Sequence, residues 1–311
     1  MAQAAGGALA SACAHAGALG LLGGGYGELS WLQTQHALAL HLLSSEATAL
    51  KRLGCGFITW KMDVDASTLD WLLDQPHTPA ALMLSFGDPR PYAARIAKRG
   101  VPLICQIQRL EQLPQCLEAG AAVIVAQGAE AGGHGMQGLQ GRATFSLVPE
   151  LADALAGQSP STLLLAAGGI ADGRGLAAAL MLGADGVLMG TRLWASAESL
   201  ASSGAVAAAL QAHGDDTVRS SVFDVLRRKN WPPEFDFRAL RNRLHREWEL
   251  RMDELRQAPE AARADYEAGV AVQDFDRAHV TVGEAVGLLR DAPSAAVLIA
   301  RITQQAEALI G

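Results

Sequence analysis

Seven short apolar runs recur along the 311-residue chain, and segments of helix length separate them. The segments between the runs carry helical spacing, as in Leu176, Ala179 and Leu180. This alternation is typical of parallel strands, each covered by the helix that follows it. The runs are Leu19 to Gly23, Gly56 to Trp60, Ala81 to Phe86, Pro102 to Ile107, Ala122 to Gln127, Leu163 to Gly168 and Gly186 to Gly190.

Polar and glycine-rich residues follow several of these runs, which favours an α/β fold of the (β/α)8 TIM-barrel type over an open doubly wound sheet. The chain opens on a predicted helix, Gly6 to Gly17, so the barrel lacks its first strand. A barrel that is short of one strand has two unpaired edges. Either the barrel closes imperfectly or the missing strand lies upstream and the chain is truncated. We expect the second.

Three segments are predicted along the chain. Residues 1–195 form the barrel. Residues 196–282 are expected to be a helical insertion, broken at Trp231-Pro232-Pro233 and containing a charged helix from Leu240 to Leu255. This insertion would serve as a lid or as a homodimer surface, although such charged faces are often simply solvated. Residues 283–311 return to apolar periodicity and are predicted to be closing helices packed on the barrel.

The composition limits the partners. The net charge of −7 gives no electrostatic footprint for nucleic acid or for an anionic membrane. The first basic residue is Lys51, and no apolar run approaches the length of a membrane span, so we expect a cytoplasmic protein. The cysteines lack metal-ligand spacing, so we predict reduced core thiols and no metal site. They are Cys13, Cys55, Cys105 and Cys116.

A glycine-rich loop follows the run that ends at Gln127, and it contains a single histidine. Gly132, Gly133 and Gly135 flank His134 and leave room for a planar ligand to approach the backbone. The loop lies where a barrel strand should end, which is the edge where barrel enzymes keep their active sites. Taken alone, the motif favours an ordinary exposed turn, because short motifs often match by chance.

Two later loops change that balance. Gly168 and Gly169 end one predicted strand, and Leu188-Met189-Gly190-Thr191 ends the next. In barrels the loops after the last two strands hold phosphate through backbone N–H groups. Each loop alone is as easily a strand-to-helix turn or a packing contact, but together they favour the phosphate of a cofactor. No G-x-G-x-x-G follows a first strand, which argues against a dinucleotide on a Rossmann unit.

Several stretches together carry a resemblance to a known family. They are Gly17 to Tyr26, Gly56 to Trp60, Val125 to Gly135 with its E-A-G-G-H-G core, Ala167 to Ile170, Gly186 to Thr191, Trp231-Pro232 and Gly283-Glu284-Ala285. In these stretches the chain resembles the nitronate monooxygenases, formerly called 2-nitropropane dioxygenases, which are FMN-binding TIM barrels. It departs from them in lacking their first strand with its proline–methionine segment. It also has Gly135-Met136 after His134 in place of a basic residue.

The resemblance implies a role for each matching residue. His134 would be the catalytic acid or base beside the flavin, since an imidazole takes a weakly acidic carbon-bound proton near neutral pH. Gln106 would bond the pyrimidine edge of the ring or face solvent, and Glu130 would orient the loop or bind nothing. The remaining cofactor-binding residues would be Gln127, Gly132 and Gly133 along FMN, Gly168 and Gly169 at its phosphate, and Leu188, Met189, Gly190 and Thr191 at the phosphate or ribityl chain.

The implied activity is the FMN-dependent oxidation of alkyl nitronates, or of nitroalkanes after proton abstraction by His134, to a carbonyl compound and nitrite with O2. The partners would be that small-molecule substrate and O2. Two alternatives stay open at this point. One is an oxidoreductase that consumes NAD(P)H, similar to the flavin-dependent enoyl-acyl-carrier-protein reductases. The other is a truncated, flavin-free barrel with only a binding or structural role.

Overall fold

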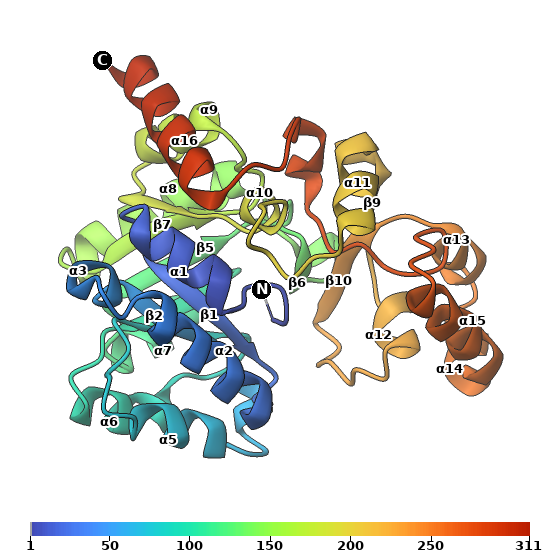
Figure 1. Ribbon diagram of the computed structural model, residues 1–311, viewed down its shortest axis with the longest axis horizontal. Helices are drawn as coiled ribbons and strands as arrows, with labels where there is room; N and C mark the ends of the chain where they lie inside the picture. Colours follow the sequence, from blue (N-terminus) through green and yellow to red (C-terminus); the bar gives the residue numbers. More distant parts are fainter. Residues whose placement is uncertain (1) are drawn as a thin grey trace.

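The computed structural model describes residues 2–311 and contains a curved sheet of parallel strands (Figure 1). The sheet has seven strands in the order β1-β2-β3-β4-β5-β7-β8, so each strand lies beside the next barrel strand of the sequence. All seven predicted strands are confirmed, with ends that differ by a few residues. Their bounds are β1 Gly20–Gly25, β2 Leu53–Ile58, β3 Leu82–Ser85, β4 Leu103–Ile107, β5 Val123–Gln127, β7 Leu163–Ala167 and β8 Gly186–Leu188.

Strands β1 and β8 are the two ends of this sheet, and no backbone ladder joins them within residues 2–311. The barrel is therefore one strand short of eight, as the sequence predicts. One backbone hydrogen bond forms at the outer edge of β1, where the Gly23 N–H donates to the Ala5 carbonyl at 2.8 Å. The predicted first helix is also present, as α1 (Gly7–His15).

Helices cover the outer face of the sheet, and strand alternation divides the side chains between two apolar clusters. In β4, Leu103 and Cys105 point outward into the large cluster under the helices, whereas Ile104 points into the barrel interior. The helices are α2 Leu29–Leu42, α3 Ala47–Leu50, α4 Thr59–Met62, α5 Ser67–Leu73, α6 Arg90–Lys98, α7 Leu113–Glu118, α8 Thr144–Gln158, α9 Gly173–Met181 and α10 Thr191–Trp194.

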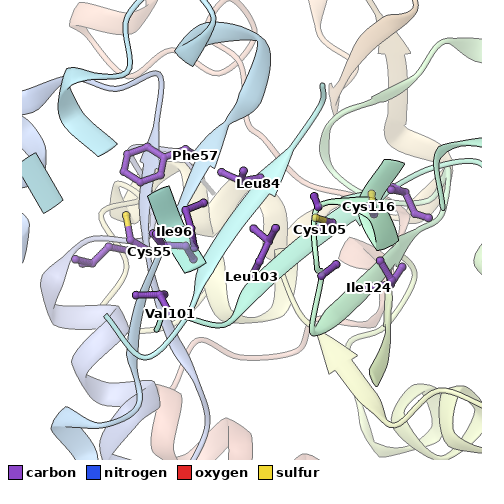
Figure 2. Packing of buried hydrophobic residues seen from close by; sticks show 14 of the residues in the cluster. Cys55, Phe57, Leu84, Ile96, Val101, Leu103, Cys105, Cys116 and Ile124 are labelled. Carbon is purple, nitrogen blue, oxygen red and sulfur yellow. The ribbon is translucent and has the colours of Figure 1, made fainter. Parts of the chain in front are cut away.

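The four cysteines are all buried and free, which confirms the predicted core thiols. Figure 2 shows Cys55, Cys105 and Cys116 among the apolar side chains of the outer cluster. Burial raises the pKa of Cys55 to about 12, so its thiol is protonated at neutral pH. Protonated buried thiols are poor nucleophiles, and these cysteines therefore serve packing.

A second, antiparallel sheet lies beside the barrel in the order β6-β10-β9. Strand β6 (Gly133–Met136) comes from the loop after β5, while β9 (Thr217–Ser220) and β10 (Phe235–Leu240) come from the segment 196–282. That segment therefore contains strands as well as helices. Its helices are α11 Ser203–Gln211, α12 Val222–Leu226, α13 Arg243–Trp248, α14 Met252–Gln257 and α15 Glu260–Ala271.

The prediction of one helix from Leu240 to Leu255 is wrong. Leu240 ends β10, and the remainder forms α13 and α14 with a break around Arg251. Along β10 buried and half-buried residues alternate strictly, with Phe235, Phe237 and Ala239 buried. A period of two indicates a strand that is covered on one face. A charged helical pattern begins directly after this strand, and the prediction extended that helix back to Leu240.

The chain ends in η4 (Glu284–Leu288) and α16 (Ala295–Ile310). Helix α16 packs against α9 and α1 on the outside of the barrel (Figure 1). A Cβ built on Gly173 of α9 would lie 2.3 Å from the Cβ of Gln305, so the two helices approach each other closely there. Of the helices within residues 2–311, none is long and apolar enough to cross a membrane.

Candidate active site

His134 lies at the carboxyl edge of the barrel, where the two sheets meet. Gln127 ends β5, and its Nε2 donates to the His134 carbonyl at 2.9 Å. In the second sheet His134 pairs with Phe237 of β10. The residue is only 8% exposed, so the structure places the predicted histidine in a buried site and excludes the alternative of an exposed turn.

Three side chains from the segment 196–282 contact the His134 imidazole, and one of them is Phe237, whose ring centroid lies 4.9 Å away. Asp224 of α12 is 4% exposed, and its Oδ1 and Oδ2 lie 2.9 and 3.1 Å from Nε2. The indole of Trp231 stacks on the ring with centroids 3.4 Å apart and planes inclined by 10°. Within residues 2–311 no hydrogen bond involves Nδ1. One ring nitrogen is therefore engaged and the other is free.

Burial lowers the pKa of His134 below its usual range. The cations Arg227 and Arg219 act in the same direction, and Asp224 opposes them by favouring the charged ring. Desolvation is the largest of these influences, so the imidazole is neutral at pH 7. A neutral imidazole with a free nitrogen can accept a proton.

Aromatic side chains from the ends of the first three strands hold Trp231 over the histidine. Tyr26, just after β1, accepts a hydrogen bond from Trp231 Nε1 at 3.0 Å. Trp60 and Phe86 meet the indole edge to face, with centroids 5.3 and 5.1 Å away. Phe86 has φ of +65°, a conformation that costs a non-glycine residue roughly 1–3 kcal/mol and recurs at functional sites. The strained turn after β3 directs this ring toward Trp231.

The glycine loop is tied to its surroundings by Glu130. The Glu130 carboxylate accepts hydrogen bonds from the backbone N–H and the hydroxyl of Thr144, both at 3.0 Å, at the start of α8. Of the two predicted alternatives for Glu130, the structure shows the orienting one. A Cβ on Gly132 would come within 2.5 Å of the Gly283 nitrogen, so this glycine permits a close backbone approach. The structural requirement at Gly132 is therefore independent of any ligand.

A buried arginine holds the other side of the same loop. Arg219 of β9 donates to the carbonyls of Ala131 and Asp236, both at 2.6 Å, and to those of Gly133 and Ala129 at 3.1 and 3.2 Å. Burial, followed by repulsion from Arg238, lowers the pKa of Arg219 to about 10, so the guanidinium is still charged at neutral pH. Sequence reasoning missed this residue, which clamps the loop that carries His134.

Of the two predicted phosphate loops, the one after β7 lies against the glycine loop, and the one after β8 contacts Gly283. Gly168 and Gly169 have φ of +103° and +73°, values that glycine adopts without strain. A Cβ on Gly168 would lie 3.2 Å from the Ala131 nitrogen, so the two loops touch. None of the backbone N–H groups of Gly168, Gly169, Gly190 and Thr191 donates a hydrogen bond to another of residues 2–311. The Thr191 hydroxyl accepts one from the Gly283 N–H at 2.8 Å.

Glutamines meet inside the barrel, beside the histidine loop. Gln106 and Gln108 donate to Gln127 Oε1 at 3.1 and 2.8 Å. Gln106 therefore faces this interior network and not bulk solvent. Gln108 is 2% exposed and was not among the predicted residues.

The two apolar residues predicted at the cofactor divide between the faces of the sheet. The Leu188 side chain joins the barrel interior, whereas that of Met189 packs in the outer cluster under the helices. Strand alternation explains the difference. Met189, the first residue after β8, can therefore contribute only its backbone to the predicted cofactor site.

These features define an enzyme with an α/β-barrel fold whose buried histidine lies at the carboxyl edge of the strands. The family model described as nitronate monooxygenase matches residues 59–305. Nitronate monooxygenase npaC of Metarhizium robertsii is 36% identical over 277 residues, which cover 84% of this chain and 75% of that protein. The chain belongs to the nitronate monooxygenase family and is thus a flavin-dependent oxidoreductase.

Solved structures confirm the fold. FabK from Thermotoga maritima superposes with a TM-score of 0.81 at 26% identity, over 100% of this chain and 91% of that one. A nitroalkane oxidase from Streptomyces ansochromogenes superposes with a TM-score of 0.75 at 22% identity, over 99% of this chain and 95% of that one. Family membership supports an enzyme and argues against the third interpretation of the sequence, a barrel without enzymatic activity.

Proposed function

We propose that this enzyme binds FMN and oxidises alkyl nitronates, and nitroalkanes after His134 has removed a proton, to a carbonyl compound and nitrite with O2. The observation that carries the proposal is the free Nδ1 of a neutral, buried His134 at the carboxyl edge of the barrel. FMN, when bound, supplies the electron chemistry with O2. The protein supplies position, a proton acceptor and a site shielded from water.

The loops after β7 and β8 fit the phosphate of FMN. Their unpaired N–H groups are donors without side chains in the way, which suits an anion. Arg192, in the helix that follows β8, turns away to Asp291, with which it forms an ion pair at 3.3 Å. Backbone amides would therefore hold the phosphate. The cradle would consist of Gly168, Gly169, Met189 through its backbone, Gly190 and Thr191.

The residues between this cradle and His134 fit the rest of the cofactor. Gln106 and Gln127 present a hydrogen-bonded amide network in the barrel interior, suited to the polar edge of a flavin ring. Leu188 adds an apolar surface to the same interior. Gly132 and Gly133 keep the loop free of side chains next to the ring.

The proton step uses the plane of the imidazole. Nδ1 accepts the proton on the carbon that bears the nitro group, and the electron pair of the broken C–H bond passes into the nitro group to give the nitronate. The lone pair of Nδ1 lies in the ring plane, so the stacked indole of Trp231 covers the ring face without covering the base. The rings of Trp60, Phe86 and Phe235 surround the indole and would accommodate the alkyl part of the substrate.

The test is to add FMN to the purified protein and assay it with nitroethane and with its preformed nitronate. We expect flavin absorbance that stays with the protein on gel filtration, and nitrite release coupled to O2 uptake with both substrates. NAD(P)H oxidation with an enoyl thioester, without nitrite release from either nitro compound, would instead establish the reductase alternative. Protein that does not retain flavin would contradict the cofactor assignment.

A further inference from the structure

Asp224 contacts the histidine on the side away from its free nitrogen. We propose that Asp224 is a positioning residue that keeps the neutral His134 protonated on Nε2 and thereby makes Nδ1 the base. This inference rests on the proposed function, in which His134 removes the proton of a nitroalkane. It assigns the base to one atom and gives a role to a residue of the segment 196–282.

The geometry carries the assignment. Both Asp224 oxygens lie within 3.1 Å of Nε2, and an ionised carboxylate only accepts hydrogen bonds. Nε2 must therefore bear the hydrogen. A neutral imidazole has a single N–H, so Nδ1 keeps its lone pair. The opposite tautomer would place two acceptors against each other in a buried site, which is costly.

The carboxylate is held firmly where it acts. Asp224 lies in α12 between Phe223 and Leu226, each 1% exposed, in the apolar cluster of the segment 196–282. Its backbone N–H donates to the Ser221 carbonyl at 3.1 Å, and its carbonyl accepts from the Lys229 N–H at 2.8 Å. A packed helix therefore sets the position of the carboxylate, and through it the rotation of the imidazole.

The carboxylate also matters after the proton has moved. When Nδ1 gains the substrate proton, the ring becomes an imidazolium with hydrogens on both nitrogens. The Nε2–H then forms an ion pair with Asp224, which stabilises the cation in a buried site. The other charged groups that act on the imidazole, Arg227 and Arg219, are cations and disfavour the imidazolium. Among these groups, only Asp224 favours the charged ring.

Charges also surround Asp224 itself. Asp236 of β10 and Lys229, which follows α12, both interact with it electrostatically. Asp236 is half-buried and makes no hydrogen bond to the imidazole. Asp236→Asn is therefore a matched control, because it removes a nearby carboxylate from the sheet that contains His134 without removing a hydrogen bond to the imidazole.

The direct experiment reads the tautomer and does not depend on activity. In protein labelled with ¹⁵N-histidine, the His134 signals are assigned by their loss in His134→Gln, and the ring couplings show which nitrogen carries hydrogen. We expect Nε2–H in the native protein and in Asp236→Asn. In Asp224→Asn we expect a shift toward Nδ1–H, because the new amide N–H can donate to Nε2.

Kinetics and pH supply the second readout. Asp224→Asn should lower kcat/KM for nitroethane roughly 100-fold or more, as loss of an orienting carboxylate does elsewhere, and should affect the preformed nitronate far less. The acidic limb of the pH profile for nitroethane should move to lower pH, because the variant lacks the Asp224 carboxylate, which raises the pKa of His134. If Asp224 had a purely structural role, the substitution would reduce kcat/KM equally for both substrates and would leave the acidic limb of the pH profile unchanged.

Native protein with hydrogen on Nδ1 overturns the inference, and this result does not depend on whether an Asp224 variant folds. An unchanged tautomer in Asp224→Asn, together with unchanged nitroethane turnover, overturns it as well. A different result would contradict the proposed function. If His134→Gln still converts nitroethane at the native rate, His134 is not the base, whatever tautomer the spectra show.

Discussion

Arg219→Met tests whether the clamp on the histidine loop is as important as its geometry implies. The substitution keeps an apolar stem of similar length and removes the guanidinium. The carbonyls of Ala131 and Asp236 lose their bonds of 2.6 Å, and those of Gly133 and Ala129 lose longer ones. A hydrogen bond to a charged group contributes roughly 1.5–3 kcal/mol, so the two short bonds alone represent about 3–6 kcal/mol.

Part of that loss is offset, because the variant no longer buries a charge or repels Arg238. We therefore expect a decrease of about 2–4 kcal/mol in the free energy of unfolding. Urea denaturation followed by circular dichroism measures it. Arg246→Met is the control, since Arg246 is 57% exposed and pairs with Asp276 only at 3.4 Å, so its loss should cost less than about 1 kcal/mol. Equal decreases in the two variants would refute the reasoning.

Three further predictions follow from the site and its surroundings. Trp231→Leu should raise the pKa of His134 in an NMR titration, because burial is the largest cause of its lowering, and an unchanged pKa would show that the indole does not shield the ring. Gly132→Ala should lower the thermal midpoint by several degrees, through a strain of about 1–3 kcal/mol against Gly283, and a native midpoint would contradict this close approach. Burial lowers the pKa of His279 to about 3, whereas the unfolded value is about 6.5, so unfolding below pH 6.5 takes up a proton and stability should fall with decreasing pH. His279→Phe should reduce that dependence, and an identical pH dependence in the variant would count against it.

The barrel was predictable because most of its strands are buried on both faces and appear in the sequence as plain apolar runs between helices. The glycines of the proposed phosphate loops were equally visible, since they follow directly on those runs. The orientation of single side chains was not. Met189 was predicted at the cofactor, yet strand alternation directs its side chain into the outer core.

The contacts of His134 could not be read from the sequence in the same way. Asp224 is 90 residues away along the chain and lies on a five-residue helix without a recognisable motif. Its position depends on how the segment 196–282 docks through the ladder between β6 and β10. The alternation along β10 was a usable signal for that strand. Nothing in the alternation indicates its pairing with the histidine loop, because such pairing is set by tertiary packing.

The central claim is that His134 is the base at an FMN site, and the most direct test is His134→Asn with matched substrates. We predict that the variant retains FMN, loses roughly 10²- to 10⁴-fold in kcat/KM for nitroethane, and stays within a few-fold of the native enzyme on the preformed nitronate. The preformed nitronate needs no proton removal, so it controls for damage to the rest of the site. Equal losses on both substrates, or native turnover of nitroethane, would contradict the claim.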